Sequence, residues 1–498
     1  MADAGQSFLG LDIGTSAIKA LLVDERQHVL AEAHADLNVL RPHPLWSEQD
    51  PQSWIDGVNS AVAALRLAAP QGFAALAGIG LSGQMHGAVF LDAAERVLRP
   101  AILWNDGRAF AECAALEASR ADYRQRAGNI AMPGFTAPKA LWAATHEPEV
   151  FRATRRVLLP KDFVRLRLSG EAVSEMSDAS GTLWLDIAKR RWDDALLAAC
   201  GLTTAQMPSL VEGSALSAYL LPALAKAWGL GERRIPIAGG GGDNAASAVG
   251  VGAVAPGDGF LSLGTSGVVF AVTDRYVSCP ERTLHAFCHA LPGRWHGMSV
   301  MLSAAASLSW IAGLLGQGEN IGALVDAAQA FSATPDAAGA PIFLPYLSGE
   351  RTPHNDAQAT GLFAGLRASH GAAALTFSVL EGVAFSFADG VDVLKESGAH
   401  LNSTMLVGGG ARSSFWGQMI ADVAGLTIDL PAGAEAGAAL GAARLAMLAA
   451  GAGDEAAICA RPDVQRRFAP APEAAARYGA RLRRYRALYG AEKATRQA

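Results

Sequence analysis

The sequence contains few cysteines, and their spacing is not that of a metal site. Its 498 residues include five cysteines, and none of them forms a Cys-x-x-Cys pair. They are Cys113, Cys200, Cys279, Cys288 and Cys459. An odd number of scattered cysteines predicts reduced thiols, argues against a zinc site, and is typical of a cytoplasmic protein.

Features that would indicate a membrane or nucleic-acid partner are also scarce. No uninterrupted apolar run is long enough to span a bilayer, and residues 1–7 lack the basic and apolar regions of a signal peptide. The formal net charge is −6, so no overall positive field attracts nucleic acid or an anionic membrane. An arginine-rich stretch follows residue 473, and we interpret it as a terminal helix that docks through its tyrosines. We therefore expect a cytoplasmic protein that binds neither nucleic acid nor membrane.

The phosphate-binding loop of the P-loop kinases is absent as well. Its pattern, Gly-x-x-x-x-Gly-Lys followed by Ser or Thr, occurs nowhere in the chain. The chain instead has 54 glycines, several of them in short clusters that follow apolar segments. A hydrophobic content of 51% predicts a folded protein, and the length predicts two or more domains.

The longest glycine cluster lies within residues 237–246, where an apolar strand leads into four glycines followed by Asp243 and Asn244. Glycines let the backbone adopt positive φ and let other groups come close. Asp243 would then lie where a strand becomes a helix, at the mouth of a cleft, which suits a general base. Alternatively, Asp243 merely caps the helix that begins near Asn244. These ten residues alone favour neither interpretation.

The N-terminal segment predicts three antiparallel strands, and its first turn is Gly14-Thr15-Ser16. This turn offers backbone N–H groups and two hydroxyls with little side-chain bulk, which suits phosphate oxygens. Asp12, just before the turn, is suited to hold a hydrated Mg²⁺, and Lys19 can reach a phosphate as a point charge. The alternative is a plain β-turn, since Gly-Thr-Ser often occurs by chance.

A second copy of this hairpin strengthens the phosphate interpretation. Gly264-Thr265-Ser266 lies 250 residues later between two similar apolar strands, and aligning the two turns also brings Asp24 onto Asp274. Self-similarity at half the chain length predicts two similar α/β domains, 1–250 and 251–498. Two such hairpins facing each other across an interdomain cleft would clamp one nucleotide, as in the actin and hexokinase arrangement.

Two further segments have the composition of a sugar site. Met85 and His86 lie in a turn between two glycines, where a small polar molecule can approach the backbone. Trp104 and Asp106 follow the end of a predicted strand and combine an aromatic ring with polar groups. The ring would stack on the C–H face of a sugar while polar groups meet its hydroxyls. The alternatives are a histidine engaged in local hydrogen bonds and a surface turn with Trp104 packed beneath it.

A third glycine cluster follows the strand predicted before residue 408. Gly408, Gly409 and Gly410 precede Arg412 and the start of a predicted helix. Three glycines would let an adenine ring or a ribose lie against the backbone. A close-packed turn between strand and helix is an equally good interpretation.

Taken together, these segments resemble the FGGY family of carbohydrate kinases. The motifs concerned are Asp12-x-Gly14-Thr15-Ser16-x-x-Lys19, Gly241-Gly242-Asp243-Asn244, Gly264-Thr265-Ser266 and Gly408-Gly409-Gly410-Ala411-Arg412. The segments 41–51, 84–87, 104–108 and 343–354 resemble the bacterial xylulokinase branch of that family. The resemblance extends to about residue 450. Each motif is weak alone, and their order and spacing make the match strong.

The resemblance implies two ribonuclease-H-like domains, an N-terminal one for the sugar (1–250) and a C-terminal one for the nucleotide (251–498). It implies transfer of the ATP γ-phosphate to the 5-hydroxyl of D-xylulose, with Asp243 as proton acceptor and Mg²⁺ near Asp12. On the sugar we expect Met85, His86, Trp104, Asp106 and Asn244. On the nucleotide we expect Gly14, Thr15, Ser16, Lys19, Gly264, Thr265, Ser266, Gly408, Gly409, Gly410 and Arg412.

Three other functions remain compatible with the residues. The nearest is a kinase of the same family that acts on another ketose, a sugar acid or glycerol. An actin-like or chaperone-like ATPase would use the same nucleotide clamp, although a chaperone needs a peptide-binding domain and fewer than fifty residues follow residue 450. A sugar sensor without catalysis is disfavoured by Asp243. The oligomeric state is open, a homodimer being one possibility.

Overall fold

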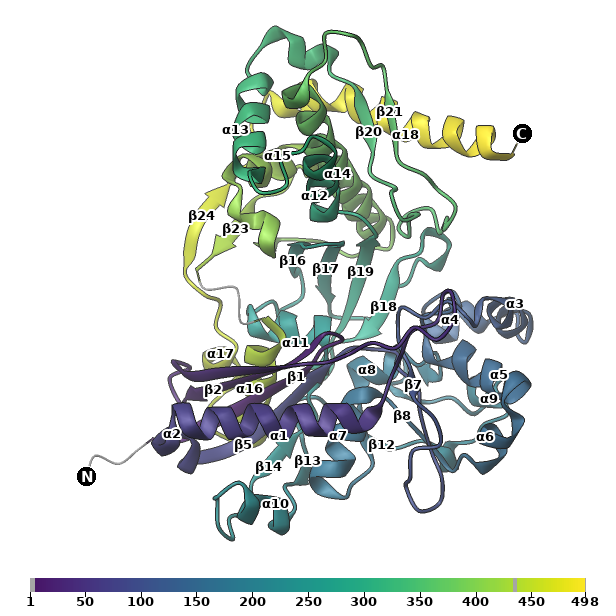
Figure 1. Ribbon diagram of the computed structural model, residues 1–498, viewed down its shortest axis with the longest axis vertical. Helices are drawn as coiled ribbons and strands as arrows, with labels where there is room; N and C mark the ends of the chain where they lie inside the picture. Colours follow the sequence, from purple (N-terminus) through teal and green to yellow (C-terminus); the bar gives the residue numbers. More distant parts are fainter. Residues whose placement is uncertain (1–4, 433–436, 498) are drawn as a thin grey trace.

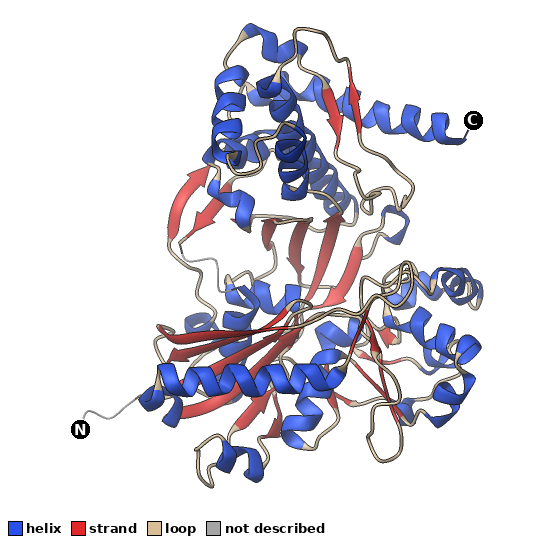
Figure 2. Ribbon diagram, in the orientation of Figure 1, coloured by secondary structure: helices blue, strands red, loops and turns tan. Residues whose placement is uncertain are grey.

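Two seven-stranded mixed sheets, one from each half of the chain, form the framework of the structure (Figure 1). The computed structural model describes residues 5–432 and 437–497. The two sheets lie one above the other in Figure 2, and helices pack around each of them.

The first sheet has the order β13-β14-β5-β1-β2-β3, with β15 beside β5. The three N-terminal strands form the predicted antiparallel meander, and β5 lies parallel to β1 on its other side. The turn between β1 and β2 is Gly14-Thr15-Ser16. The strands are β1 (Ser7–Ile13), β2 (Ala17–Asp24), β3 (Val29–Asp36), β5 (Leu76–Gly83), β13 (Leu216–Tyr219), β14 (Pro236–Ala238) and β15 (Gly241–Gly242).

The second sheet, in the order β18-β19-β17-β16-β22-β23-β24, repeats this topology. The hairpin β16–β17 turns on Gly264-Thr265-Ser266, β19 continues it antiparallel, and β22 lies parallel to β16. Its strands are β16 (Asp258–Leu263), β17 (Gly267–Thr273), β18 (His285–Cys288), β19 (Trp295–Met301), β22 (Ser403–Val407), β23 (Ile428–Pro431) and β24 (Val464–Phe468). The prediction of two similar α/β domains of the ribonuclease-H type is confirmed.

Short elements and helices connect and cover the sheets. In the first half they are β4 (Glu48–Gln49), α1 (Pro51–Ala68), α2 (Pro70–Ala74), β6 (Val89–Leu91), β7 (Ala101–Ile102), α3 (Phe110–Ala118), α4 (Tyr123–Ala127), α5 (Thr136–His146), α6 (Pro148–Ala153), β8 (Arg156–Leu158), α7 (Pro160–Ser169), β9 (Val173–Glu175), α8 (Met176–Ser180), β10 (Leu185–Asp186), β11 (Arg191–Trp192), α9 (Asp194–Ala198), β12 (Ser209–Val211), α10 (Pro222–Ala227) and α11 (Asp243–Gly250). In the second half they are α12 (Ala305–Leu314), α13 (Ile321–Ser332), β20 (Ile342–Leu344), β21 (Leu362–Ala364), α14 (Ala372–Glu396), α15 (Ser414–Ala424), α16 (Gly437–Ala449), α17 (Glu455–Ile458) and α18 (Ala474–Gln497).

Helix α1 shows how local sequence sets an element and the face that it buries. The Asp50 side chain accepts a hydrogen bond from the Gln52 N–H, and Pro51 occupies the first turn, where its missing N–H costs nothing. Trp54 and Val58 are buried four residues apart, so one stripe of the helix covers β2 and β3.

Helix α16 comes from the second half of the chain yet packs on the first sheet, against β1 and β5, and on α11 (Figure 1). The approach is so close that it needs glycine. A Cβ atom added to Gly80 would lie 1.8 Å from the Ala442 carbonyl oxygen, and one on Gly441 would lie 1.7 Å from that of Ala246. The division of the chain at residue 250 stays a prediction, because α16 joins the first sheet from beyond that point.

Two long helices belong to the second domain. By its length and composition, α14 is the one helix of the described residues that could cross a membrane, but 94% of its most apolar stretch is buried inside the protein. That is the burial of a core helix. Helix α18 docks on it, with Tyr478 and Tyr485 buried and Arg481 paired with the buried Glu381. The predicted docking of the C-terminal helix through tyrosines is confirmed.

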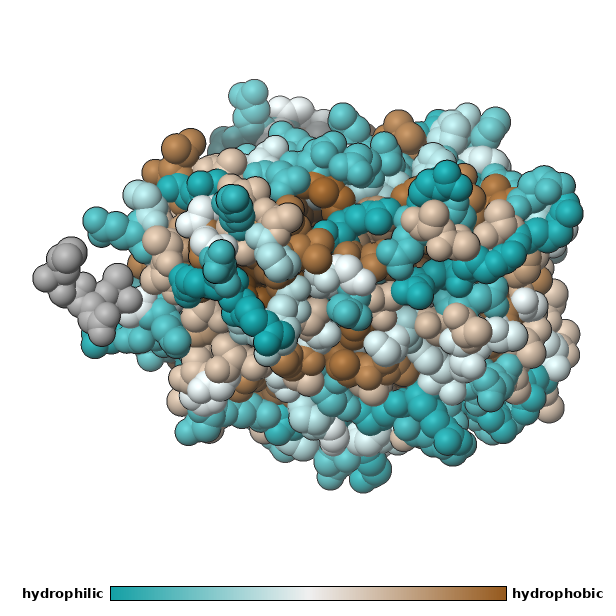
Figure 3. Space-filling model, turned by 90° about the horizontal axis from the view of Figure 1, so that it is seen from below, coloured by the Kyte–Doolittle hydropathy of each residue, from teal (hydrophilic) through white to brown (hydrophobic). Residues whose placement is uncertain are grey.

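The surface of the molecule on the side of the first domain carries both polar and apolar residues. In Figure 3 polar residues cover much of this face, and apolar residues lie among them in small separate groups. This pattern is ordinary for a folded protein surface.

The close packing of α16 yields a first prediction. Gly441→Ala should lower the melting temperature, because its Cβ clashes with backbone and overpacking costs about 1–3 kcal/mol. Gly313→Ala in α12 is the matched control, since nothing lies within 4 Å of its added Cβ, and alanine in an exposed helix stabilises by about 0.5–1 kcal/mol. Calorimetry should show shifts of opposite sign. Shifts of the same sign would show that α16 tolerates looser packing.

Candidate active site

Asp243 lies where β14 and the glycine run meet α11. Gly240 has a φ of 81°, so the run uses a conformation that glycine adopts readily. The capping position of α11 is Gly242, and Asp243 is the first residue inside the helix. Its Oδ1 accepts from the N–H and the side-chain amide of Asn244 at 2.7 and 3.0 Å. The capping position is thus Gly242 and not Asp243, although the Asp243 carboxylate still accepts a backbone N–H of the first turn.

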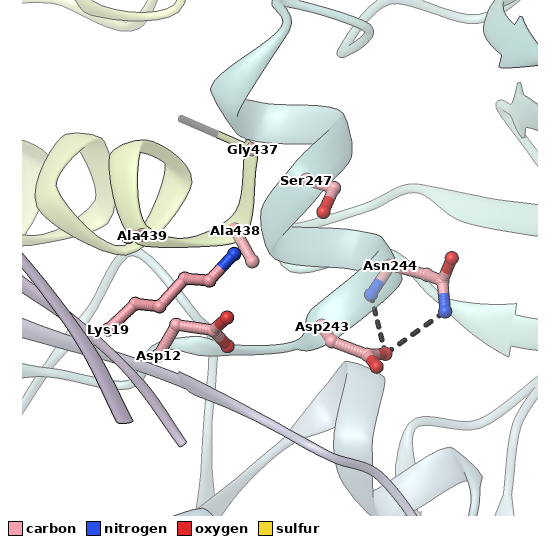
Figure 4. A pocket seen from close by; sticks show the side chains of 8 residues that line it. All are labelled: Asp12, Lys19, Asp243, Asn244, Ser247, Gly437, Ala438 and Ala439. Atoms are coloured by element: carbon pink, nitrogen blue, oxygen red, sulfur yellow. Dashed lines mark hydrogen bonds between the residues drawn. The ribbon is translucent and has the colours of Figure 1, made fainter. Parts of the chain in front are cut away.

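Four of the predicted site residues meet at one cavity of about 280 Å³. Figure 4 shows Lys19 reaching over Asp12, with Asp243 and Asn244 in the first turn of α11 and the start of α16 on the opposite side. Asp12 and Lys19 face each other across the β1–β2 hairpin. The cavity is lined by Asp12, Lys19, Asp243, Asn244, Ser247, Gly437, Ala438 and Ala439.

The two carboxyl groups of this cavity are partly withdrawn from water. Burial raises the pKa of Asp243 to about 6, the charge of Asp12 adds to the effect, and the hydrogen bonds from Asn244 oppose it. Burial also raises the pKa of Asp12, while the positive charge of Lys19 lowers it. A carboxyl group whose pKa is raised in this way suits a general base.

The residues fit a hydrated Mg²⁺ at Asp12. Its buried Oδ1 has no hydrogen-bond partner among the described residues, and carboxylate oxygens are preferred ligands of this ion. No group of three or more His, Cys, Asp or Glu residues able to hold a metal occurs in the described part of the chain. A single carboxylate suits Mg²⁺ that keeps its waters and binds substrate phosphates.

The first Gly-Thr-Ser turn is held in place through the Thr15 side chain. Its hydroxyl donates to Gln84 Oε1 at 3.1 Å and accepts from Trp104 Nε1 at 2.9 Å. Among the described residues, the N–H groups of Thr15 and Ser16 donate no hydrogen bond. The backbone of the turn can therefore serve a phosphate, and Trp104 connects the turn to the predicted sugar segment.

Sequence reasoning assigned no role to the two glutamines that support this turn. Gln49 Nε2 donates to the Thr15 carbonyl at 2.7 Å, and Gln84 Nε2 donates to Gln49 Oε1 at 2.9 Å. Both glutamines lie in motifs that carried the family resemblance. Nothing in the sequence pairs them with Thr15, because strand β5 and the first turn become neighbours only in the folded sheet.

The third glycine cluster borders a larger cavity, of about 1050 Å³. A Cβ on Gly408, whose φ is 92°, would lie 2.9 Å from the Leu263 carbonyl carbon, directly before Gly264. Gly408, Gly409 and Arg412 line the cavity together with residues of β2 and β3. Its walls thus come from both domains.

Gly410, Thr265 and Ser266 do not line this larger cavity. Gly410 packs against the Leu263 side chain, where a Cβ would come within 2.5 Å of its Cγ. Thr265 and Ser266 are exposed, and their N–H groups donate no hydrogen bond within the described chain. The second turn therefore matches the first in offering free backbone donors.

Met85 packs on the glycine run, whereas His86 contacts the Gly181 carbonyl and the ring of Phe135. A Cβ on Gly242 would lie 2.9 Å from Met85 Sδ, so Met85 covers the residue that precedes Asp243. Burial lowers the pKa of His86 to about 3, which keeps its ring neutral. His86 Nδ1 is 2.9 Å from the Gly181 carbonyl, which can only accept a hydrogen bond. The proton is then on Nδ1, and Nε2 can accept from a sugar hydroxyl.

Trp104 and Asp106 lie close in sequence but are placed in different surroundings. Trp104 is 43% exposed, which leaves much of its ring open for stacking. Asp106 is buried and accepts from the Ser47 N–H and from the Arg108 side chain. The Arg108 guanidinium in turn lies 3.5 Å over the Trp46 ring. Because both Asp106 oxygens are engaged internally, its role in sugar binding stays a prediction.

Comparison with known families gives this arrangement a context. Residues 7–250 match the N-terminal domain and residues 259–450 the C-terminal domain of the FGGY family of carbohydrate kinases. The chain belongs to the FGGY family. The resemblance inferred from the motifs is confirmed, and the protein is an ATP-dependent carbohydrate kinase.

Individual FGGY kinases are similar to this chain over nearly their full length. The xylulose kinase of Escherichia coli (strain K12) is 54% identical over 444 residues, which are 89% of this chain and 90% of that protein. The xylulose kinase of Bacillus subtilis (strain 168) is 35% identical over 94% of this chain and 93% of its own. The crystal structure of a xyloylose kinase from Brucella ovis has a TM-score of 0.94 and 50% identity, covering 98% of this chain and 100% of that one.

The electrostatics of the FGGY site yield a second prediction. The Asp243 carboxyl should titrate with a pKa of about 6, and Asp12→Asn should lower this pKa because it removes a neighbouring negative charge. Carbon-13 NMR of labelled aspartate, assigned with Asp243→Asn, measures the shift without requiring activity. Asp194→Asn, at the exposed start of α9, should leave the titration unchanged. An unaltered pKa in Asp12→Asn would mean that the two carboxyl groups do not interact.

Proposed function

We propose that the protein transfers the γ-phosphate of ATP to the 5-hydroxyl of D-xylulose, with Asp243 as the base that accepts the hydroxyl proton. The observation that carries the proposal is the cavity where Asp243, with a pKa of about 6, meets Asp12 and Lys19. The similarity to xylulose kinases over about nine-tenths of the chain supports the choice of sugar.

Asp243 would act as the sugar hydroxyl attacks. An alcohol is a weak nucleophile at neutral pH, and a positioned carboxylate that accepts its proton is typically worth about 10²–10⁴-fold in rate. A pKa of about 6 leaves most Asp243 side chains ionised at pH 7 and basic enough to take the proton. As the pH falls below 6 the carboxylate is protonated, so the rate should decline on the acidic side.

The phosphates would be bound mainly by backbone and by one lysine. The free N–H groups of Thr15 and Ser16 in one domain, and of Thr265 and Ser266 in the other, would contact phosphate oxygens. Lys19 would add a positive charge. When bound, Mg²⁺ at Asp12 would neutralise phosphate charge, and in-line positioning would supply most of the remaining acceleration.

The nucleoside would occupy the cavity of about 1050 Å³ beside Gly408 and Gly409. On the sugar side, Met85 would cover the substrate next to Gly242, Asn244 would contact a hydroxyl, and His86 Nε2 would accept another. The Trp104 ring would stack on the sugar. We also propose a cytoplasmic location, which the five free cysteines support.

A substrate panel tests the function directly. ADP release with ATP and Mg²⁺ should be stimulated strongly by D-xylulose and weakly by other pentuloses, hexuloses, sugar acids and glycerol. Asp243→Asn should reduce kcat by about 10²–10⁴-fold while nucleotide binding persists, and Asp194→Asn should leave kcat unchanged. If a different polyol stimulated ADP release and D-xylulose did not, that polyol would be the substrate in place of D-xylulose. Hydrolysis that ignores every sugar would favour a filament-forming or chaperone-like ATPase.

A separate variant tests the sugar contact of His86. Its φ of 69° is left-handed, a region that asparagine tolerates better than alanine, so His86→Asn changes the ring with the least backbone strain. The KM for the sugar should rise about tenfold or more, as expected for loss of a buried hydrogen bond. The Kd for ATP, measured by calorimetry, should stay within twofold of wild type, about 0.4 kcal/mol. Equal loss of both affinities would indicate damage to the fold.

A further inference from the structure

Five ionisable side chains lie fully buried directly behind the glycine run. Lys161 Nζ is 2.7 Å from Asp162 Oδ1, 3.3 Å from Asp178 Oδ2 and 3.5 Å from Glu175 Oε1. Arg165, on the same helix α7, is 3.8 Å from Asp162. None of these side chains is exposed to solvent. Burying so many charges is costly unless they are paired and also bonded to other groups.

The cluster combines two cations with three carboxyl groups. Burial raises the pKa of Asp178 well above its ordinary value and also raises that of Glu175, while the charge of Lys161 opposes both shifts. The ion pairs of Lys161 join α7 to Glu175 and to Asp178 of α8, so the groups that these elements bind are attached to one fixed unit.

The cluster binds the backbone at both ends of the four-glycine run, residues 239–242. The near end is the one that follows β14, and the far end is the one that leads into α11. On the near side, the Arg165 guanidinium donates to the Ala238 carbonyl at 2.6 Å and to the Gly239 carbonyl. On the far side, the Gly242 N–H donates to Ser177 Oγ at 3.0 Å, and the Ser177 hydroxyl donates to Glu175 Oε1 at 3.0 Å. Gly242 is the residue immediately before Asp243.

The glycine run needs such support because it has no side chains of its own. The Gly239 and Gly240 N–H groups donate to backbone carbonyls of residues 215 and 213, each at 2.8 Å. Beyond them, Ser177 accepts the N–H of Gly242, at the entry to α11. Without that bond, glycine's conformational freedom would let the first turn of α11 and its carboxylate shift.

We propose that Ser177 and Arg165 are positioning residues that fix the Asp243 carboxylate by holding the glycine run at its two ends. This inference rests on the proposed role of Asp243 in phosphoryl transfer. Neither side chain reaches the cavity, and both act through the backbone. A displacement of about 1 Å at a reacting group is enough to cost about a hundredfold in rate.

The chain offers a matched pair of variants for the test. Ser177 and Ser180 both lie buried on α8, and each hydroxyl accepts a backbone N–H. Ser180 accepts that of Cys288, away from the glycine run. Ser177→Ala should lower kcat by about tenfold to a hundredfold while the KM values for sugar and ATP stay near wild type. Ser180→Ala should leave kcat near wild type, and both variants should melt at similar temperatures.

Hydrogen exchange gives a readout that does not depend on turnover. In Ser177→Ala the peptide covering residues 239–245 should exchange faster than in wild type, and in Ser180→Ala it should not. Equal kcat losses in the two variants, or unchanged exchange in Ser177→Ala, would overturn the proposal. Failure of the proposed function is a different result, because Asp243→Asn would then keep its activity whatever Ser177→Ala does.

Discussion

The close approach of α16 to α11 and to strands β1 and β5 is the constraint on which the site depends. Backbone meets backbone there, and the added side chains of Gly80 and Gly441 would lie within 2 Å of carbonyl oxygens. This packing joins the last third of the chain to the first sheet. It also brings the start of α16 to the cavity that contains Asp12 and Asp243. The packing of α16 on the first sheet thus forms one wall of this cavity.

The positions of Asp12 and Asp243 follow from the pairing of strands in the first sheet. Asp12 ends β1 and Asp243 starts α11, and parallel pairing of β1 with β5 and of β5 with β15 sets these ends side by side. Burial raises the pKa of both carboxyl groups, and the charge of Asp12 adds to the rise at Asp243. A pKa of about 6 is what the proposed role of Asp243 as a base requires. Behind the cavity lies the buried charged cluster of Lys161, Arg165 and their acidic partners. Its hydrogen bonds to the glycine run limit the conformational freedom of that backbone.

Local motifs were predicted well where the chemistry is carried by neighbouring residues. The two Gly-Thr-Ser turns, the flanking strands and the position of Asp243 at a strand-to-helix junction each depend on a few consecutive residues, and the spacing of the two turns revealed the doubled topology. The capping position lies at Gly242 because the helix begins one residue earlier than expected, and the Asp243 carboxylate accepts the N–H of Asn244 inside the first turn. Asp106 could not be judged from its motif, since the bond from the distant Ser47 N–H, which engages Oδ2 together with the nearby Arg108, forms only when the loops fold together.

The sequence by itself determined the family, the two hairpins, the position of Asp243 at a strand-to-helix junction and the absence of a P-loop, since each is written in short runs of neighbouring residues. Only the tertiary structure decided which groups share the cavity, that Gln49, Gln84 and Trp104 bond to the first Gly-Thr-Ser turn, and that Ser177 and Arg165 bond to the glycine run. The physical reason is distance along the chain. Hydrogen bonds and pKa shifts depend on separations of a few ångströms, and those separations are set by sheet pairing and helix packing between segments far apart in the sequence.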